Sequence, residues 1–210
     1  MTSSVLNAVV VPVIRMSQKT HALTAITLLA EHNISTFEIT LTTPGAAELI
    51  SELTHREGIL VGAGTVLDRA QAAMCIDAGA RFIVSPVTRT DIAAYCASVG
   101  IACFLGAATP TEILTAHEAG ATAVKIFPAA QLGGPAFVKA VKSVFPHIDL
   151  MPTGGIGLGD VPAYLSAGAR CVGMGGKLVD EQAIRDGRYD DIHHAARQIS
   201  AQLAELRRAP

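Results

Sequence analysis

A helical pattern that closes at glycine or asparagine, followed within a few residues by an apolar run, occurs four times along the chain. The four phrases are "AEHNISTFEITL", "IDAGARFIVSP", "HEAGATAVKIFP" and "LSAGARCVGMG", which close at Asn33, Gly79, Gly120 and Gly168. Both residue types suit this position because the residue that ends a helix often adopts a left-handed conformation. The closing residues are about 45 residues apart, which leaves room for two strand–helix units in each interval.

Four further apolar runs, at residues 9–15, 59–65, 101–107 and 148–155, bring the expected strands to eight. The segments between them carry apolar residues at three- and four-residue steps, the period of an amphipathic helix. Strands that are apolar throughout are typical of a parallel sheet buried on both faces. The sequence therefore predicts a small (β/α)8 barrel, a single α/β domain over residues 1–210 that ends in an amphipathic helix. An open doubly wound sheet is the alternative, which the lack of GxGxxG after the first strand disfavours.

The composition limits the kinds of molecule and membrane with which the chain is expected to interact. The chain has 210 residues, of which 50% are hydrophobic and 16% charged, and its formal net charge is -2. Such a chain can bury a sizeable core and offers no overall field for nucleic acid or an anionic membrane. No apolar run approaches the roughly 18 residues of a membrane span. The N-terminal segment has no basic region ahead of its apolar stretch, so we do not expect a secretory signal.

Cysteine and histidine usage argues against structural disulfides and metals. The cysteines are scattered without CxxC pairs, which predicts buried thiols in the reducing cytoplasm; they are Cys75, Cys96, Cys103 and Cys171. No HxH or HExxH motif lies at a strand end, so we expect neither a catalytic metal nor another cofactor.

In a barrel of this type the active site lies at the carboxyl ends of the strands. The polar and small residues at the expected ends are Arg15, Glu38, Thr40, Thr42, Gly64, Thr65, Ser85, Pro86, Gly106, Thr109, Lys125, Thr153, Gly154, Gly155, Gly173, Gly175 and Gly176. One acid and one lysine are therefore expected to converge on the same opening.

Lys125 lies within the apolar run "ATAVKIFPAA", where an ammonium group is costly to bury. In one interpretation the side chain reaches past the strand end into water. In the other it is a Schiff-base nucleophile, because apolar neighbours such as Phe127 favour the neutral amine that attacks a carbonyl.

Glu38, between Phe37 and Ile39, also has two interpretations. It could be a structural partner of Lys125 or Arg15. It could instead move protons during imine chemistry, when the carbinolamine loses water and when an enamine carbon gains a proton. Arg15 is equally open, since it could bind a carboxylate or phosphate or could balance Glu38. Thr65 and Thr40 could be hydrogen-bond donors or simply favourable strand residues.

Two glycine pairs follow the last two expected strands, in "MPTGGIG" and "VGMGGKLVD". Uncovered backbone N–H groups there suit a phosphate, and the loops after strands seven and eight are its usual place in such barrels. Either pair alone could serve only a tight turn.

In order, the segments "VPVIR", "FEITLTTPGA", "VGAGTV", "FIVSP", "TPTEI", "VKIFPA" and "PTGGI" resemble the 2-keto-3-deoxy-6-phosphogluconate (KDPG) / 4-hydroxy-2-oxoglutarate (KHG) aldolases, over about residues 9–180. The resemblance implies a metal-free class I aldolase of the Entner–Doudoroff pathway, usually a homotrimer. It implies Lys125 as the Schiff-base lysine and Glu38 as the acid/base. It also implies Thr65 and Pro86 beside the pyruvyl group, Phe127 packed under the site, and Thr153, Gly154 and Gly155 at the phosphate.

Three positions depart from the family pattern. Thr42 stands where some members have an arginine that holds the substrate carboxylate, so Arg15 is the candidate for that role. Gly176, beside Gly175, replaces a frequent serine of the phosphate loop, and Leu105-Gly106 replaces Pro-Gly. The reaction expected is cleavage of a 2-keto-3-deoxy sugar acid phosphate to pyruvate and glyceraldehyde 3-phosphate.

Other functions remain as alternatives. An unphosphorylated substrate such as KHG would need a cation for its distal carboxylate, and Lys177 is the nearest one to the glycine loops. A phosphosugar isomerase or epimerase would use the same loops without a covalent amine. A non-catalytic sugar-phosphate sensor would leave the pairing of Lys125 with Glu38 unexplained.

Overall fold

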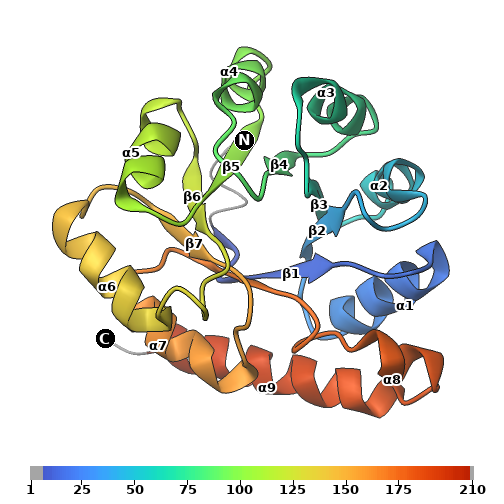
Figure 1. Cartoon of the computed structure of the whole chain (residues 1–210). Coiled ribbons are helices and arrows are strands. Elements are labelled where there is room, and N and C mark those ends of the chain that lie inside the picture. The colour runs from blue at the N-terminus through green and yellow to red at the C-terminus, as the bar shows by residue number, and fades with distance from the viewer. Residues whose placement is uncertain (1–6, 209–210) are drawn as a thin grey trace.

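The structure, a computed structural model, describes residues 7–208. The first six residues of the segment considered for a secretory signal, and the last two of the expected C-terminal helix, lie outside this range. Eight strands surround a central axis and the helices form an outer ring (Figure 1). The strands are β1 Val10–Ile14, β2 Thr36–Thr40, β3 Leu60–Gly64, β4 Phe82–Val84, β5 Ala102–Ala107, β6 Ala123–Ile126, β7 Leu150–Pro152 and β8 Val172–Met174.

The helices of the outer ring alternate with the strands along the chain. They are α1 Lys19–Ala30, α2 Ala46–Thr54, α3 Arg69–Asp77, α4 Thr90–Ser98, α5 Pro110–Glu118, α6 Gly134–Val144, α7 Val161–Ser166, α8 Glu181–Arg185 and α9 Tyr189–Arg208, with a 3-10 turn η2 at Leu158–Asp160. The expected helix closures are confirmed, because Asn33, Gly79, Gly120 and Gly168 have φ values of 62°, 101°, 90° and 101°. No helix within residues 7–208 has the length and apolar character needed to cross a bilayer.

All strand pairs are parallel, in the order β7-β6-β5-β4-β3-β2-β1-β8. A bridge between Thr153 and Gly173 joins the two ends of this order and closes the barrel. The barrel prediction is confirmed and the open-sheet alternative is wrong. The strand expected at 148–155 is reduced to Leu150–Pro152, because Gly154 and Gly155 take positive φ values of 99° and 75° and turn the chain out of the sheet.

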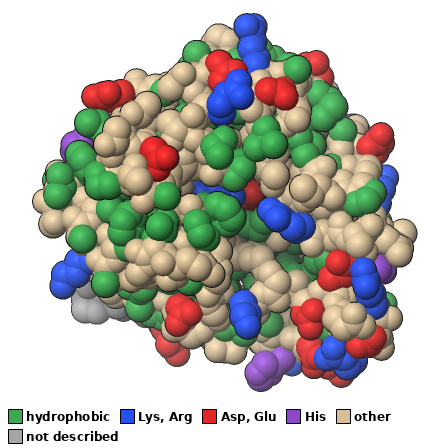
Figure 2. Space-filling view, in the orientation of Figure 1, with side chains coloured by type: hydrophobic (Ala, Val, Ile, Leu, Met, Phe, Trp, Pro, Cys, Tyr) green, Lys and Arg blue, Asp and Glu red, His purple; other side chains and the backbone are tan. Residues whose placement is uncertain are grey.

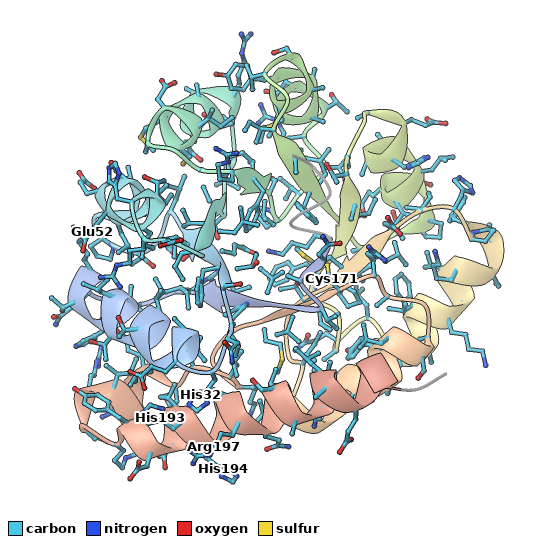
Figure 3. All side chains as sticks on the ribbon, turned by 180° about the vertical axis from the view of Figure 1, so that it is seen from behind. His32, Glu52, Cys171, His193, His194 and Arg197 are labelled. Carbon is cyan, nitrogen blue, oxygen red and sulfur yellow. The ribbon has the colours of Figure 1, made fainter. Side chains whose placement is uncertain are left out.

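The barrel interior is filled below the active-site end by one apolar cluster, made of Val11, Phe82, Val84, Ala102, Phe104, Ala123, Met151 and Cys171. A larger apolar cluster lies between the strands and the helices. Figure 3 shows Cys171 close to the barrel centre. Burial raises the pKa of Cys171 to about 12, and all four cysteines are buried free thiols, as expected.

The long C-terminal helix α9 packs along α1 on the outside of the barrel (Figure 3). His32 Nε2 and His193 Nδ1 are 3.0 Å apart at this contact, and the Ser200 hydroxyl donates to the His32 carbonyl. His194 and Arg197 are on the exposed side of the helix. The predicted amphipathic helix is therefore present, and it begins at Tyr189.

Candidate active site

Lys125 projects into the barrel from β6. Side chains two residues apart on a strand share a face, and Ala123 belongs to the apolar cluster that fills the barrel interior. Lys125 is only 4% exposed, and its Nζ atom is 3.2 Å from Glu38 Oε1. The interpretation in which the amine reaches out into water is therefore wrong.

Glu38, on β2, is fully buried beneath the amine. Its Oε1 accepts the hydrogen bond from Lys125, while its Oε2 is buried without a partner among the described residues. Room for this carboxylate comes from Gly64 on β3, where an added Cβ would lie 2.1 Å from Glu38 Oε1. Arg15 does not balance Glu38; its Nη2 atom instead donates to Thr65 Oγ1 at 3.4 Å.

A cavity of about 570 Å³ opens above the pair, a volume suited to a small metabolite. Ten of the twelve predicted site residues line it: Arg15, Thr65, Pro86, Lys125, Phe127, Thr153, Gly154, Gly155, Gly175 and Gly176. Glu38 lies below Lys125 and is not among the lining residues. Thr42 is not among them either: it is exposed, and its hydroxyl lies 2.9 Å from Thr40 Oγ1. Figure 2 shows the hollow near the centre of this face, with Lys or Arg side chains beside it.

Four residues that line the cavity were outside the predicted set. Lys177 was noted only as a possible cation, and Val13, Ile156 and Val179 were not identified. In the sequence these apolar residues are indistinguishable from core positions. For Val13 the alternation of side chains along β1 was a usable signal. Val13 lies on the same face of the strand as Val11, which is in the barrel interior, so the alternation indicates that it points inward.

Two other residues that were expected at strand ends make local contacts and do not line the cavity. Thr109 is the N-cap of α5, where its hydroxyl and the Glu112 side chain form a reciprocal capping box. Hydrogen bonds from the backbone of Ala108 and from Thr109 lower the pKa of Glu112. Ser85 is fully buried after β4 and accepts from the Val87 N–H at 3.4 Å.

The loop after β7 is built around two glycines that a side chain would disturb. Both have positive φ; a Cβ on Gly154 would lie 3.2 Å from the Phe127 ring, and one on Gly155 would lie 2.6 Å from Ala130. The Thr153 N–H donates to Ile126 and its carbonyl accepts from Ala129, which ties the loop to the end of β6. The Gly155 N–H donates to no acceptor in residues 7–208.

The electrostatic character of the cavity is positive. No Asp or Glu occurs among the described residues that line it, whereas Arg15, Lys125 and Lys177 do. Lys125 is neutralised by Glu38, and its Nζ lies 5.7 Å from the centre of the Phe127 ring. Within residues 7–208 no group of three His, Cys, Asp or Glu side chains could hold a metal. A buried amine beside a carboxylate, below an anion-attracting cavity, suits a negatively charged carbonyl compound.

The family model and the related sequences agree on one family. The family model described as "KDPG and KHG aldolase" matches residues 1–195. The 2-dehydro-3-deoxy-phosphogluconate aldolase of Haemophilus influenzae is 33% identical over 192 residues, which are 90% of each chain.

Two of the solved structures with the same fold bear on the chemistry and the assembly. A KDPG aldolase from Legionella pneumophila, with pyruvate captured as a covalent carbinolamine intermediate, superposes with a TM-score of 0.84 and 31% identity. The match covers 96% of this chain and 97% of that one. A cube-shaped protein cage designed by fusing symmetric oligomeric domains superposes with a TM-score of 0.81 and 27% identity, covering 95% of this chain and 76% of the cage chain.

Proposed function

Because the chain belongs to the KDPG and KHG aldolase family, we propose that it is a class I aldolase that cleaves 2-dehydro-3-deoxy-6-phosphogluconate (KDPG) to pyruvate and glyceraldehyde 3-phosphate. The observation that carries this proposal is the buried contact of 3.2 Å between Lys125 Nζ and Glu38 Oε1 at the floor of a positively charged cavity. This reaction belongs to the Entner–Doudoroff pathway.

The first stage forms an imine. Lys125 gives a proton to Glu38, and the neutral amine attacks the C2 ketone to form a carbinolamine. Glu38 then protonates the C2 hydroxyl, which leaves as water and gives the iminium. The contact between the two side chains supports this direct proton transfer, because general acid–base partners must lie within hydrogen-bond reach.

The second stage breaks the carbon–carbon bond. The Glu38 carboxylate, directly or through a water molecule, takes the proton of the C4 hydroxyl. The C3–C4 bond breaks, its electrons move into the iminium, and glyceraldehyde 3-phosphate leaves. Glu38 then protonates C3 of the enamine, and hydrolysis of the pyruvyl imine restores Lys125. The unpartnered Oε2 of Glu38 supports this second role, because it leaves one carboxylate oxygen available while the other faces Lys125.

The two ends of the substrate are assigned to different sets of residues. Arg15 and Thr65 hold the carboxylate next to C2, and Pro86 and Phe127 form the walls around the pyruvyl group. The distal phosphate meets Thr153 and the glycine loops, whose backbone N–H groups suit a dianion. Gly176 lacks the hydroxyl that a serine would add, so the preference for phosphate over a distal carboxylate is weakened rather than lost.

Assembly and location complete the proposal. We assign the protein as a homotrimer, supported by the symmetric oligomeric domains of the similar cage protein. We assign it to the cytoplasm; the four buried cysteines, which are free thiols, support this because thiols stay reduced there.

The experiment that tests the function is release of pyruvate from KDPG, followed with a coupled dehydrogenase. We expect Lys125→Met to lower kcat/KM by at least about a thousandfold, as for loss of a covalent nucleophile. Lys139→Met on the exposed face of α6 is the matched control and keeps wild-type activity. KDPG cleavage by Lys125→Met at the wild-type rate would exclude the proposed mechanism, and cleavage of neither KDPG nor KHG by the wild type would exclude the function.

A further inference from the structure

Lys177 is a cation at the cavity that no other part of the described chain neutralises. It follows β8 in the loop that contains Gly175 and Gly176, and it lines the cavity. The side chain is exposed, and it makes no hydrogen bond or ion pair within the described residues. Lysines on protein surfaces usually meet water, so its place on the cavity wall is the informative feature.

The two unneutralised cations follow neighbouring strands and face different neighbours across the cavity. Arg15, after β1, donates to Thr65 at the end of β3. Lys177 lies after β8, which pairs with β1 on one side and is joined to the β7 loop on the other by the bridge between Thr153 and Gly173. The C1 carboxylate is bonded to the carbon that Lys125 attacks, so it must stay next to Lys125. In the proposed function the far end of the substrate meets the glycine loops, and Lys177 directly follows the second of these loops on the cavity wall.

The chemistry of a lysine suits recognition of charge rather than of shape. Its ammonium is a point charge on a flexible stem and imposes no fixed bidentate geometry, unlike arginine. The neighbouring Gly176 adds no hydroxyl, although a Cβ there would meet no atom within 4 Å and its φ is not positive. Among the described residues that line this end of the cavity, Lys177 is therefore the one that adds a charge beside the glycine loops and Thr153.

We propose that Lys177 is the specificity-determining residue for the distal end of the substrate. It recognises negative charge, on a phosphate or on a carboxylate, and gives no advantage to a neutral distal hydroxymethyl group. This inference rests on the proposed aldolase function and assigns recognition of the distal anion to one side chain of this chain.

The test compares three substrates that share the pyruvyl group and differ in distal charge: KDPG, KHG and unphosphorylated 2-dehydro-3-deoxygluconate. We expect Lys177→Met to lower kcat/KM about three- to tenfold for KDPG, and less for KHG, as for a partly solvated charged hydrogen bond. The change should appear in KM, and activity on the neutral substrate should be unchanged. Lys139→Met, an exposed lysine outside the cavity, should alter none of the three.

Two further variants separate charge from packing. Lys177→Arg keeps the charge, and we expect it to retain most of the preference for anionic substrates. Gly176→Ser adds a hydroxyl in open space, and we expect it to raise the ratio of KDPG to KHG activity. The advantage of wild type over Lys177→Met should also shrink at high salt, because exposed charges are screened.

The inference is overturned if Lys177→Met affects all three substrates equally or affects none. Borohydride reduction with pyruvate distinguishes this failure from failure of the proposed function. Wild type and Lys177→Met should both form the reduced lysine adduct to the same extent, since Lys177 does not touch the reacting carbon. A wild-type protein that forms no adduct would instead contradict the aldolase mechanism itself.

Discussion

Lys125 and Glu38 are ionisable residues held where an isolated charge would cost several kcal/mol. Their mutual contact offsets part of this cost, and Gly64 provides the space that the carboxylate occupies. Removing one partner of such a buried pair leaves the other uncompensated, which typically costs about 3–5 kcal/mol. A site that keeps such a pair at its floor is therefore sensitive to small changes in the surrounding side chains.

Gly64→Ala tests the position of the acid without removing it. The new Cβ would lie 2.1 Å from Glu38 Oε1, so the carboxylate must move away from Lys125. We expect kcat to fall about a hundredfold, as for a displacement of about 1 Å in a reacting group, while KM changes little. The measurement is steady-state kinetics with KDPG.

Gly62→Ala, on the same strand, is the matched control. Its Cβ would lie 2.4 Å from the Phe82 ring, so it strains the apolar interior instead of the acid. Both variants should lose about 1–3 kcal/mol of stability from overpacking, but Gly62→Ala should keep most of its kcat. Equal losses of kcat in the two variants would show that position of Glu38 is not the controlling factor.

The charged site residues were predictable because their types conflict with their surroundings. A lysine and a glutamate inside apolar strands stand out as candidate site residues. Their positions near the strand ends predict that they meet at one opening of the barrel. Val13, Ile156 and Val179 were not predictable, because an apolar side chain on a cavity wall has the same sequence signature as one in the core. Nor could the sequence show that Thr42 would turn its hydroxyl toward Thr40, since this depends on the loop conformation after β2.

At the scale of elements, one polar cluster joins the start of the barrel to its end. Glu181 at the start of α8 accepts hydrogen bonds from the backbone and hydroxyl of Ser17, both at 2.7 Å, and its Oε1 lies 2.9 Å from His21 Nδ1 on α1. Arg185 donates to the same Ser17 hydroxyl. The cluster therefore holds the loop after β1, which carries Arg15, against α8.

The cluster predicts a loss of stability in acid. Burial alone would raise the pKa of Glu181, but the bonds from His21 and Ser17 outweigh it and hold the pKa at about 2, below the ordinary 4.5. A lowered folded-state pKa gives stability above the unfolded pKa that is lost as pH falls, here between about pH 5 and pH 2. The side chain is 24% exposed, so after allowance for solvent screening we expect about 1–2 kcal/mol.

Glu181→Gln checks this prediction by urea unfolding between pH 7 and pH 2. The variant should be about 1–2 kcal/mol less stable than wild type at pH 7, and the difference should shrink as pH falls through this window. Glu118→Gln on the exposed surface of α5 is the control, because it removes a carboxylate that contacts neither Ser17 nor His21. A difference between wild type and Glu181→Gln that stays constant down to pH 2 would contradict the assignment.

Most helices and strands were predictable because the residue that ends a helix can be recognised from the local sequence. The left-handed residues at Asn33, Gly79, Gly120 and Gly168 mark four helix ends in the sequence. The short length of β7 was not predictable, because the apolar run continues beyond the point where the glycine loop leaves the sheet. Likewise, nothing in the α8 sequence alone indicates that Glu181 would bind Ser17, which is far away along the chain.

At the scale of the whole molecule, closure of the barrel brings together groups from both ends of the chain. Arg15 follows the first strand and Lys177 follows the last, yet both line one cavity because β1 pairs with β8. The eight repeated strand–helix units predicted this closure. The strands run parallel because a helix returns the chain to the same end of the barrel after each strand. The sequence contains no comparably direct signal for assembly.

Assembly as a homotrimer is therefore a prediction from the family resemblance. We expect sedimentation velocity at micromolar concentration to give a single species with the mass of three 21.8 kDa chains. A homotrimer is expected to persist on dilution because stable oligomers bury large, complementary surfaces. A monomer as the only species at this concentration would contradict the assignment, without affecting the chemistry at Lys125.

The most direct test of the central claim is borohydride reduction in the presence of pyruvate, followed by mass spectrometry of proteolytic peptides. Reduction converts the imine into a stable amine, so the modified lysine can be located. We predict that the peptide containing Lys125 gains the mass of one reduced pyruvyl group, and that Lys125→Met gains none. An unmodified Lys125 after reduction, or equal labelling of other lysines, would contradict a Schiff-base mechanism at this residue.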